Sequence, residues 1–300
     1  MDKKTKIYIL MTLASIFWAG AFIAGKMGVS QFPPFSISFF RFLFATSIIF
    51  PLMIITEGSN WKLEKQYLPR IFLLGLIGMF GYHVLFFTSL KFTTAINSSL
   101  IGSTNPLITG LLASVFLREK IGIKRVFVFL LALSGVFLTL IGGDILNISL
   151  FKGNIGDLIM LLAVLCWAVY SILSKSILVE LSPIKVTAYA FLVCTILLLP
   201  FFIYERPSSY ISNISINGWL AVIYMAIFPS VMGYLIQQMA IKEIGPSSAA
   251  VFINLVPIFS IILSVLILKE TIGPIKLIGA GMVILGVYLN TRFSREKQGR

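Results

Sequence analysis

The sequence predicts an all-α integral membrane protein with ten transmembrane helices, arranged as two inverted five-helix repeats. Three observations support this fold class. Of the 300 residues, 58% are hydrophobic and 12% are charged, whereas about a quarter of the residues of a soluble domain carry charge. Ten apolar runs follow one another along the chain, and each approaches the roughly 20 residues that cross the hydrocarbon core. The second half of the chain also repeats the first.

Each apolar run is bounded by charged residues, proline or glycine, and we expect each to form one membrane-spanning helix. Lipid offers the backbone no hydrogen-bond partners, which excludes an open sheet, and the runs lack the alternation of a membrane barrel. In chain order the expected spans are 7–25, 34–55, 69–90, 94–117, 126–142, 155–174, 183–204, 219–241, 246–268 and 274–289.

The basic residues predict a multi-pass protein of the cytoplasmic (inner) membrane with both termini in the cytoplasm. With the N-terminus inside, 17 Lys and Arg residues fall in cytoplasmic segments and 6 in external ones, as the positive-inside rule requires. The run after residues 1–6 is longer than a signal-peptide core and is followed by no small-residue cleavage site. It is therefore expected to remain as the first span.

Charge and cysteine content exclude other classes of protein. The formal net charge is +13, but the basic residues lie between apolar runs, where they face anionic lipid rather than nucleic acid. Cys166 and Cys194 lie inside apolar runs, where a thiol behaves as a small hydrophobe, so no disulfide framework or metal cluster is indicated. We expect no cofactor. The expected partners are a small-molecule substrate and membrane lipid, and the expected assembly is a monomer or homodimer.

An internal repeat divides the chain into residues 1–148 and 149–300. Identical residues recur at a spacing of 149 and, after a two-residue insertion, of 151. Because each half has five spans, an odd number, the halves enter the membrane in opposite senses. Inverted repeats are typical of secondary transporters, which bind substrate near the midplane between the halves. The recurring pairs are Trp18 and Trp167, Lys26 and Lys175, Pro34 and Pro183, Pro51 and Pro200, Lys91 and Lys242, Pro106 and Pro257, Glu119 and Glu270, Gly122 and Gly273, and Gly135 and Gly286.

Short motifs in these repeats identify a family. They are WAGAF at 18–22, RFLFA at 41–45, SLKFTTA at 89–95, NP at 105–106 before LREK at 117–120, GDL at 156–158 before WAVY at 167–170, and VP at 256–257 before LKE at 268–270. The chain resembles the EamA family of the drug/metabolite transporter superfamily over nearly its whole length. The resemblance implies a central cavity lined by the first, third, fourth, sixth, eighth and ninth spans. It also implies movement of small metabolites, commonly outward.

Two prolines in matching positions of the halves, Pro106 and Pro257, predict helix breaks in the fourth and ninth spans, and such breaks often adjoin the binding site. Polar residues cluster just before both breaks. They either line the site or join helices to each other. Asn97 and Asn254 are the stronger candidates, because a buried amide has more hydrogen bonds to satisfy. The clustered residues are Asn97, Ser98, Ser99, Ser103, Thr104 and Asn105, with Ser247, Ser248 and Asn254 in the second half.

The third and eighth spans supply further candidates around their glycines, Tyr82 and His83 in one and Tyr234 and Gln237 in the other. His83, the only histidine, lies within a span. There it is either a functional residue of the transport pathway or a neutral imidazole that forms a hydrogen bond to a neighbouring helix. Only one of Gln237 and its neighbour Gln238 can face a cavity squarely.

Deep aromatic residues and a few charges complete the expected picture. Trp18, Trp167 and Tyr170 either wall a cavity or pack between helices. Arg41 is expected to extend toward the outer membrane surface, and Asp157 to complement a helix dipole. Glu119 and Glu270 are expected to form ion pairs at helix ends.

The charges also bear on mechanism. No span carries a carboxylate at its middle. The sequence therefore favours a facilitator or exchanger over a carrier that couples transport to protons or sodium through a carboxylate. The expected substrates are small metabolites, amino acids or related compounds. The alternatives are a proton-coupled drug or cation efflux transporter, a channel, and an intramembrane enzyme. The enzyme would need clustered Asp, His or serine-base groups, which the sequence lacks.

Overall fold

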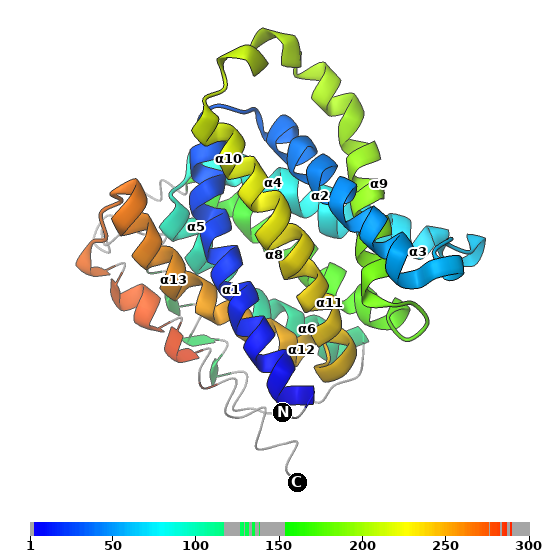
Figure 1. Cartoon of the computed structure of the whole chain (residues 1–300). Coiled ribbons are helices and arrows are strands. Elements are labelled where there is room, and N and C mark those ends of the chain that lie inside the picture. The colour runs from blue at the N-terminus through cyan, green and yellow to red at the C-terminus, as the bar shows by residue number, and fades with distance from the viewer. Residues whose placement is uncertain are drawn as a thin grey trace.

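The computed structural model describes residues 3–116 and 154–275, together with individual residues within 127–138 and 277–289. Helices make up the regular structure of these residues, and no strand occurs among them (Figure 1). Eight helical segments in the described part are long and apolar enough to cross a membrane, and they correspond to the expected first to fourth and sixth to ninth spans. The expected fifth span lies mostly outside the described residues, and the tenth is described only in part, as an apolar helix over Leu277–Gly286.

In the first half, the chain forms α1 (Lys3–Gly28), α2 (Pro34–Glu57), α3 (Leu68–Leu73), η3 (Leu74–Gly81), α4 (Tyr82–Phe92), α5 (Ala95–Gly102) and α6 (Asn105–Phe116). In the second half it forms α8 (Ile155–Ile177), α9 (Pro183–Tyr204), α10 (Ile216–Met225), η7 (Ala226–Tyr234), α11 (Leu235–Ile244), α12 (Pro246–Ala250), η8 (Val251–Leu255), α13 (Val256–Leu263) and η9 (Ser264–Leu268).

Local sequence explains where several of these helices begin. Thr94, Asn154, Ser182 and Ser215 each accept a backbone N–H bond from the first turn of the helix that follows. Such caps satisfy amides that have no partner inside the helix. Proline occupies an early position of both α2 and α9, where its missing N–H costs nothing.

The helices of the fourth and ninth spans are each interrupted close to the prolines singled out from the sequence. Ser103 and Thr104 separate α5 from α6, and Pro106 lies in the first turn of α6. In the ninth span the 3-10 segment η8 separates α12 from α13, and Pro257 lies in the first turn of α13.

The third and eighth spans contain irregularities of another kind, the π-helical segments η3 and η7. A π turn inserts an extra residue into a helix and is often found at functional sites. The glycines of η3 permit close packing: a Cβ on Gly78 would lie 2.2 Å from the ring of Tyr170. The segment η3 ends directly before the candidate Tyr82, and η7 ends with the candidate Tyr234.

The repeat-related helices α2 and α9 pack against each other in opposite directions. Phe35 stacks on Phe201 at one end of the pair, with ring centroids 4.8 Å apart. At the other end the Ser182 hydroxyl donates to Glu57 at 2.6 Å. Residue numbers therefore rise along α2 as they fall along α9, which is the relation that an inverted repeat requires.

Equivalent residues of the two repeats touch at four places. The Thr46 and Thr195 hydroxyls share a hydrogen bond of 3.1 Å, and Phe42 meets Phe191 with ring centroids 5.0 Å apart. The Trp18 and Trp167 rings lie 5.7 Å apart, and the Tyr234 hydroxyl lies 3.2 Å from His83 Nε2. Each pair is separated by 149 or 151 residues, so these contacts mark a pseudo-two-fold axis through the centre of the molecule.

The ends of the helices are fixed by charged side chains in matching positions. Lys26 Nζ donates to the carbonyl oxygens of Leu90 and Thr93 at 2.8 and 2.6 Å. Its equivalent Lys175 donates to Ile241 and Lys242 at 3.3 and 3.2 Å. Cations at helix C-termini satisfy free carbonyls and complement the dipole.

Two carboxylates act as helix caps at N-termini. Glu205 accepts the backbone N–H groups of Phe35 and Ser36 at the start of α2. Glu270 accepts those of Ala95 and Ile96 at the start of α5, with distances of 2.9 and 3.1 Å. Glu270 thus bonds to backbone amides, a role that the ion pair expected with its basic neighbours did not include, because the exposed N–H groups of α5 lie within its reach. Glu119 lies outside the described residues.

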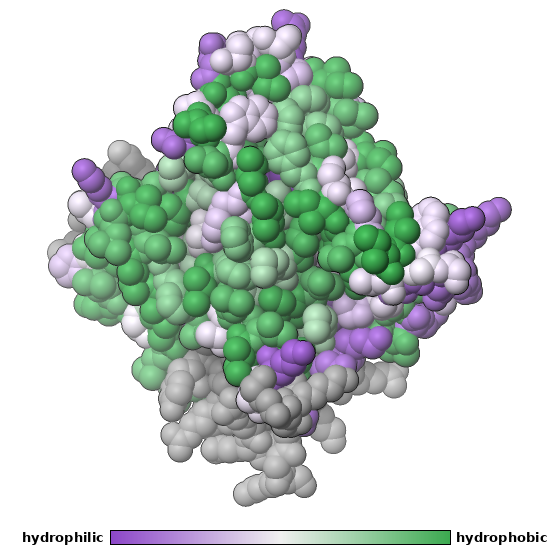
Figure 2. Space-filling view, in the orientation of Figure 1, coloured by the Kyte–Doolittle hydropathy of each residue, from purple (hydrophilic) through white to green (hydrophobic). Residues whose placement is uncertain are grey.

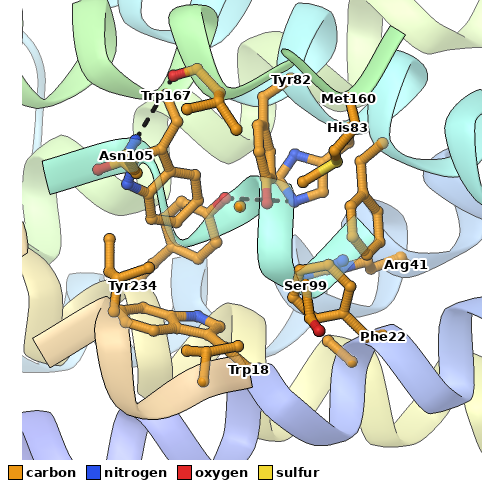
Figure 3. Close-up of a pocket in the computed structure, with 16 residues that line it drawn as sticks. Trp18, Phe22, Arg41, Tyr82, His83, Ser99, Asn105, Met160, Trp167 and Tyr234 are labelled. Carbon is orange, nitrogen blue, oxygen red and sulfur yellow. Dashed lines mark hydrogen bonds between the residues drawn. The ribbon is translucent and has the colours of Figure 1, made fainter. Parts of the chain in front are cut away.

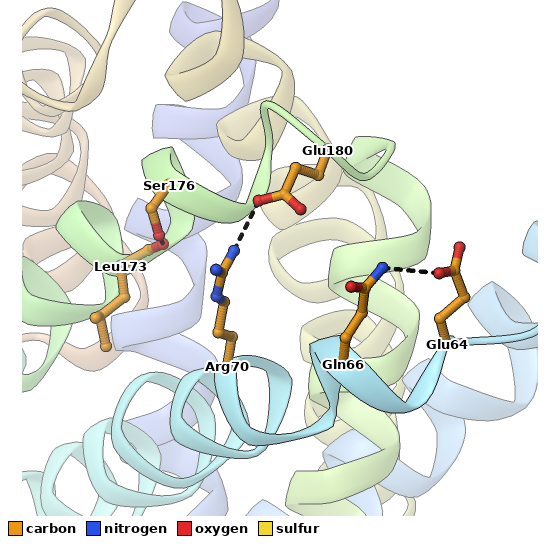
Figure 4. A network of polar contacts seen from close by, with 6 residues as sticks. All are labelled: Glu64, Gln66, Arg70, Leu173, Ser176 and Glu180. Atoms are coloured by element: carbon orange, nitrogen blue, oxygen red, sulfur yellow. Dashed lines mark hydrogen bonds and ion pairs between the residues drawn. The ribbon is translucent and has the colours of Figure 1, made fainter.

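An ion pair joins the connection before the third span to the connection after the sixth (Figure 4). Arg70 Nη1 donates to Glu180 Oε1 at 2.7 Å, and this bond lowers the pKa of the Glu180 carboxyl below its usual value. Both connections were expected on the cytoplasmic side, and the contact shows that they lie on the same side of the molecule.

The surface matches a lipid environment. Figure 2 shows a broad hydrophobic face over the middle of the molecule, with hydrophilic residues gathered toward its edges. Large apolar side chains that point outward include Ile55, Leu162, Ile196 and Leu220. Lipid takes the place of water around such side chains, so their exposure carries no penalty.

Candidate functional site

A cavity lies among the broken helices at the centre of the fold (Figure 3). It contains about 570 Å³ of space free of protein atoms, including its opening. Its wall is built from α1, α2, α4, α5, α6, α8, η7, η8 and α13, and so from both repeats. Six of the residues singled out from the sequence line it: Trp18, Tyr82, His83, Asn105, Trp167 and Tyr234.

Aromatic rings form much of this wall. The Trp167 ring packs against Tyr82 and Tyr234, with centroid distances of 4.7 and 5.1 Å. Phe22 and Phe86 meet edge to face on another part of the wall, 5.1 Å apart. Rings held in this way offer faces and edges to a flat or apolar ligand.

The position of Trp18 depends on the backbone of the eighth span. Its indole Nε1 donates to the carbonyl oxygen of Pro229 at 3.2 Å. A Cβ on Gly233 would lie 2.8 Å from the same nitrogen, so glycine at this position allows the indole to approach. The proline and the glycine of the π segment together orient one tryptophan of the central pair.

His83 is fully buried and both of its ring nitrogens have partners. The Met79 carbonyl oxygen lies 2.8 Å from Nδ1, and since a carbonyl can only accept, Nδ1 carries the proton. Nε2 then accepts from the Tyr234 hydroxyl at 3.2 Å. The neutral imidazole thus satisfies both neighbours, as in the structural alternative considered from the sequence.

The expectation that Arg41 extends toward the outer membrane surface is wrong. Its side chain is 2% exposed and lines the cavity instead of extending toward the membrane surface. Nε donates to the Ser230 hydroxyl at 2.8 Å, and the guanidinium lies 5.8 Å from the ring centroids of both Phe42 and Phe87. A polar partner and two aromatic faces near the centre remove the need to reach the surface.

Tyr170 and the glutamines of the eighth span lie outside the cavity wall. Gln238 Nε2 donates to the Tyr170 hydroxyl and, at 3.2 Å, to the Ser174 hydroxyl. These three residues join α8 to α11 beyond one end of the cavity. The Gln237 Oε1 atom is buried without a hydrogen-bond partner among the described residues.

Three polar candidates of the fourth and ninth spans also lie outside the wall. Ser98 shares a hydrogen bond of 3.1 Å with Ser89 of α4 and so joins two helices. Asn97 and Asn254 are buried, and the Asn97 carbonyl oxygen and both side-chain polar atoms of Asn254 have no partner in the described part of the chain. Of the candidates Asn97, Asn254, Tyr82 and Trp167, the structure places Tyr82 and Trp167 in the cavity wall.

Sequence reasoning missed several members of the wall. Ser99 was grouped with the polar cluster but not chosen, and Phe22, Phe86 and Met160 carry no chemical signal that separates them from core residues. The sequence does contain a signal for Arg41, because it is the only charged residue well inside an expected span.

The polar chemistry of the wall is limited to a few kinds of group. Among the described residues, no aspartate or glutamate lines the cavity. Within the described residues, no group of three or more His, Cys, Asp or Glu side chains is arranged to hold a metal ion. The wall offers aromatic surface, amide and hydroxyl groups, and one guanidinium.

Similar sequences are found in bacteria and archaea. YyaM of Bacillus subtilis (strain 168), described as an uncharacterized transporter, is 35% identical over 285 residues, which cover 95% of this chain and 93% of that protein. An uncharacterized transporter of Archaeoglobus fulgidus is 30% identical, with 96% and 98% covered. A probable terminal-alkyne amino-acid exporter of Streptantibioticus cattleyicolor is 25% identical, with 97% and 95% covered.

Comparison of folds and families agrees with the two-repeat architecture. A solved crystal structure superposes with a TM-score of 0.73, covering 97% of this chain and 98% of the other at 19% identity, which shows the same fold. The model of the EamA-like transporter family matches the chain twice, at residues 5–141 and 154–292. This multi-pass membrane protein therefore belongs to the EamA-like transporter family.

Proposed function

We propose that this protein is a secondary transporter that exports small metabolites, amino acids or related compounds, across the cytoplasmic membrane by alternating access. The observation that carries the proposal is the cavity beside the contacts Trp18–Trp167 and His83–Tyr234. A site on the axis that relates two inverted repeats can be exposed to either side when one repeat rocks against the other.

The choice of amino acids or related compounds has two supports. One similar protein carries the description of a probable amino-acid exporter. The wall of the cavity combines aromatic rings with a few polar groups, as sites for small organic molecules commonly do.

We further propose facilitated diffusion or exchange as the mode of transport. A proton- or sodium-coupled carrier needs a titrating or ion-binding group in its pathway, and no carboxylate in the described part of the chain lines the cavity. His83 already satisfies Met79 and Tyr234 in its neutral form, and a second proton on the ring would remove the acceptor for Tyr234.

The alternatives have less support. Efflux of cationic drugs fits poorly with a cavity whose only charged side chain is Arg41. An intramembrane enzyme would need a catalytic constellation, and the wall contains no carboxylate to partner its single histidine. A channel differs from a carrier in kinetics, because only a carrier shows saturation and counterflow.

Reconstitution into liposomes tests the proposed function. Liposomes loaded with unlabelled amino acids should take up labelled amino acid transiently against its gradient, with saturation and without an imposed pH gradient. Trp167→Ala should lower the transport rate at low substrate about 10-fold, because it removes one face of the cavity. Leu162→Ala, on the outward-facing side of the same helix, is the matched control. Flux without saturation would indicate a channel, and no flux across a broad metabolite panel would refute the proposal.

A further inference from the structure

Arg41 has more hydrogen-bonding capacity than its surroundings use. A guanidinium has five N–H donors, and the one at Nε is engaged by Ser230. No hydrogen bond from its Nη atoms is found among the described residues. Its guanidinium carbon also lies 5.8 Å from the ring centroids of Phe42 and Phe87.

The charge of Arg41 is also unpaired within the described structure. The ionisable side chains near enough to affect it are Tyr82, Tyr234, Cys194, Tyr224 and His83. Tyrosine, cysteine and an imidazole whose two nitrogens both form hydrogen bonds carry no negative charge at neutral pH. The wall of the cavity thus has a single positive charge without a counter-ion.

Other donors in the wall are unused as well. The Tyr82 hydroxyl makes no hydrogen bond within the described residues, and the buried Trp167 indole Nε1 has no partner there either. Figure 3 shows Tyr82, Arg41 and His83 on neighbouring parts of the wall. The cavity wall therefore presents unused hydrogen-bond donors together with one full positive charge.

A buried charge without a partner is costly, and so is a buried donor without an acceptor. An anionic ligand would satisfy both. A guanidinium fits a carboxylate well, because its planar N–H groups match the two carboxylate oxygens. One positive charge balances a monoanion, whereas a phosphate group with nearly two negative charges would remain under-compensated.

We infer that Arg41 binds the carboxylate of the transported metabolite, and that the aromatic wall formed by Trp18, Trp167, Tyr82 and Phe86 binds its apolar or aromatic body. This inference rests on the proposed transport function and specifies its substrate class. Compounds that carry a carboxylate are accepted with or without an α-amino group, and the corresponding amines without a carboxylate are rejected.

The rival explanation is that Arg41 only supports the fold. Its Nε bond to Ser230 fastens α2 to the π segment η7, and its stacking on Phe42 and Phe87 fills space. In that case the selectivity between carboxylates and amines would not depend on residue 41. Ser230→Ala, which removes the structural bond and keeps the charge, would then have the same effect as Arg41→Gln.

The experiment compares three matched probes that share a phenyl ring. Phenylalanine has a carboxylate and an amine, phenylpyruvate has the carboxylate alone, and phenethylamine has the amine alone. Binding is measured in detergent by the change in tryptophan fluorescence, and transport is measured separately by counterflow in liposomes. The parent protein should bind the two carboxylates at least about 10-fold more tightly than the amine, as expected for a charged hydrogen bond.

Variants then assign this selectivity to Arg41. Arg41→Gln should abolish the preference for carboxylates, Arg41→Lys should retain part of it, and Ser230→Ala should retain most of it. Equal or tighter binding of the amine by the parent protein would overturn the inference without any variant, so a misfolded variant does not leave it undecided.

The two measurements separate this inference from the proposed function. Selective binding of carboxylates without counterflow would support the site and refute transport. Counterflow of amines equal to that of carboxylates would support transport and refute the site. Absence of both binding and counterflow for all three probes refutes the inference.

Discussion

At the scale of single residues, the central cavity depends on positions where a side chain would be too large. Gly78 lies against the ring of Tyr170, and Gly233 lies against the indole of Trp18. Gly78 lies in η3, which directly precedes Tyr82 of the wall, and Gly233 lies in η7, which contributes Tyr234 to the wall. The sequence reveals that glycines recur there, but not which ring each one meets, because that depends on contacts between distant spans.

Substitution of these glycines should affect stability and function to different extents. Gly78→Ala places a methyl group within 2.2 Å of a buried ring and should cost about 1–3 kcal/mol, lowering the thermal unfolding temperature. Gly233→Ala should displace Trp18 and weaken substrate binding about 10-fold or more with a smaller loss of stability. Gly273→Ala, where a Cβ meets nothing within 4 Å, is the control. Unchanged unfolding of Gly78→Ala would contradict the described packing.

The role of His83 can be tested by removing its ability to titrate. His83→Gln keeps one donor and one acceptor in place of the neutral imidazole. We expect this variant to retain counterflow, and we expect an imposed pH gradient to drive no accumulation in either protein. Accumulation by the parent protein that disappears in the variant while counterflow remains would make His83 a coupling residue.

At the scale of helices, the two repeats contain equivalent lysines that cap helix C-termini, and the stability that each cap contributes can be compared. Lys26 and Lys175 occupy equivalent positions, but Lys26 makes the shorter bonds to its two carbonyl oxygens. Lys26→Met should therefore destabilise the protein by about 1–3 kcal/mol, and Lys175→Met by less. Thermal unfolding of the two variants in the same detergent measures the difference. A larger effect at Lys175 would show that bond length is a poor guide here.

Much of the helical framework is predictable from the sequence, for reasons that differ between elements. The eight described spans follow from apolar runs, and the breaks at Pro106 and Pro257 follow from the chemistry of proline. The π segments η3 and η7 are not predictable in this way, because nothing in their local sequence sets the extra residue in the turn. The same limit applies to Arg41, whose direction is decided by Ser230 on a distant span.

At the scale of the whole molecule, the membrane orientation is a prediction with a direct test. Single cysteines at positions 62 and 152 should differ in labelling from outside intact cells, with 152 labelled and 62 protected. The reason is the excess of basic residues in segments assigned to the cytoplasm. The reverse pattern would overturn the orientation.

The two ends of the cavity are not equivalent, although the repeats are. On the side expected to face the cytoplasm, Gln238 joins Tyr170 and Ser174 by hydrogen bonds. The equivalent positions at the opposite end are Phe87, Ala21 and Gly25, which have no side-chain hydrogen bonds to form. Because α8 and α11 both belong to the second repeat, these bonds hold that repeat together at this end, whereas the equivalent end of the first repeat lacks them.

This difference affects how the two repeats move. A repeat can rock as one body only if its own helices stay together, so the second repeat should keep its shape at this end more firmly than the first. Gln238→Leu removes both bonds and should slow transport at saturating substrate more than it weakens substrate binding, which kinetics and fluorescence titration of the variant would separate. The carrier then has a stiff half and a pliable half, and its rate is set by how well the stiff half holds together.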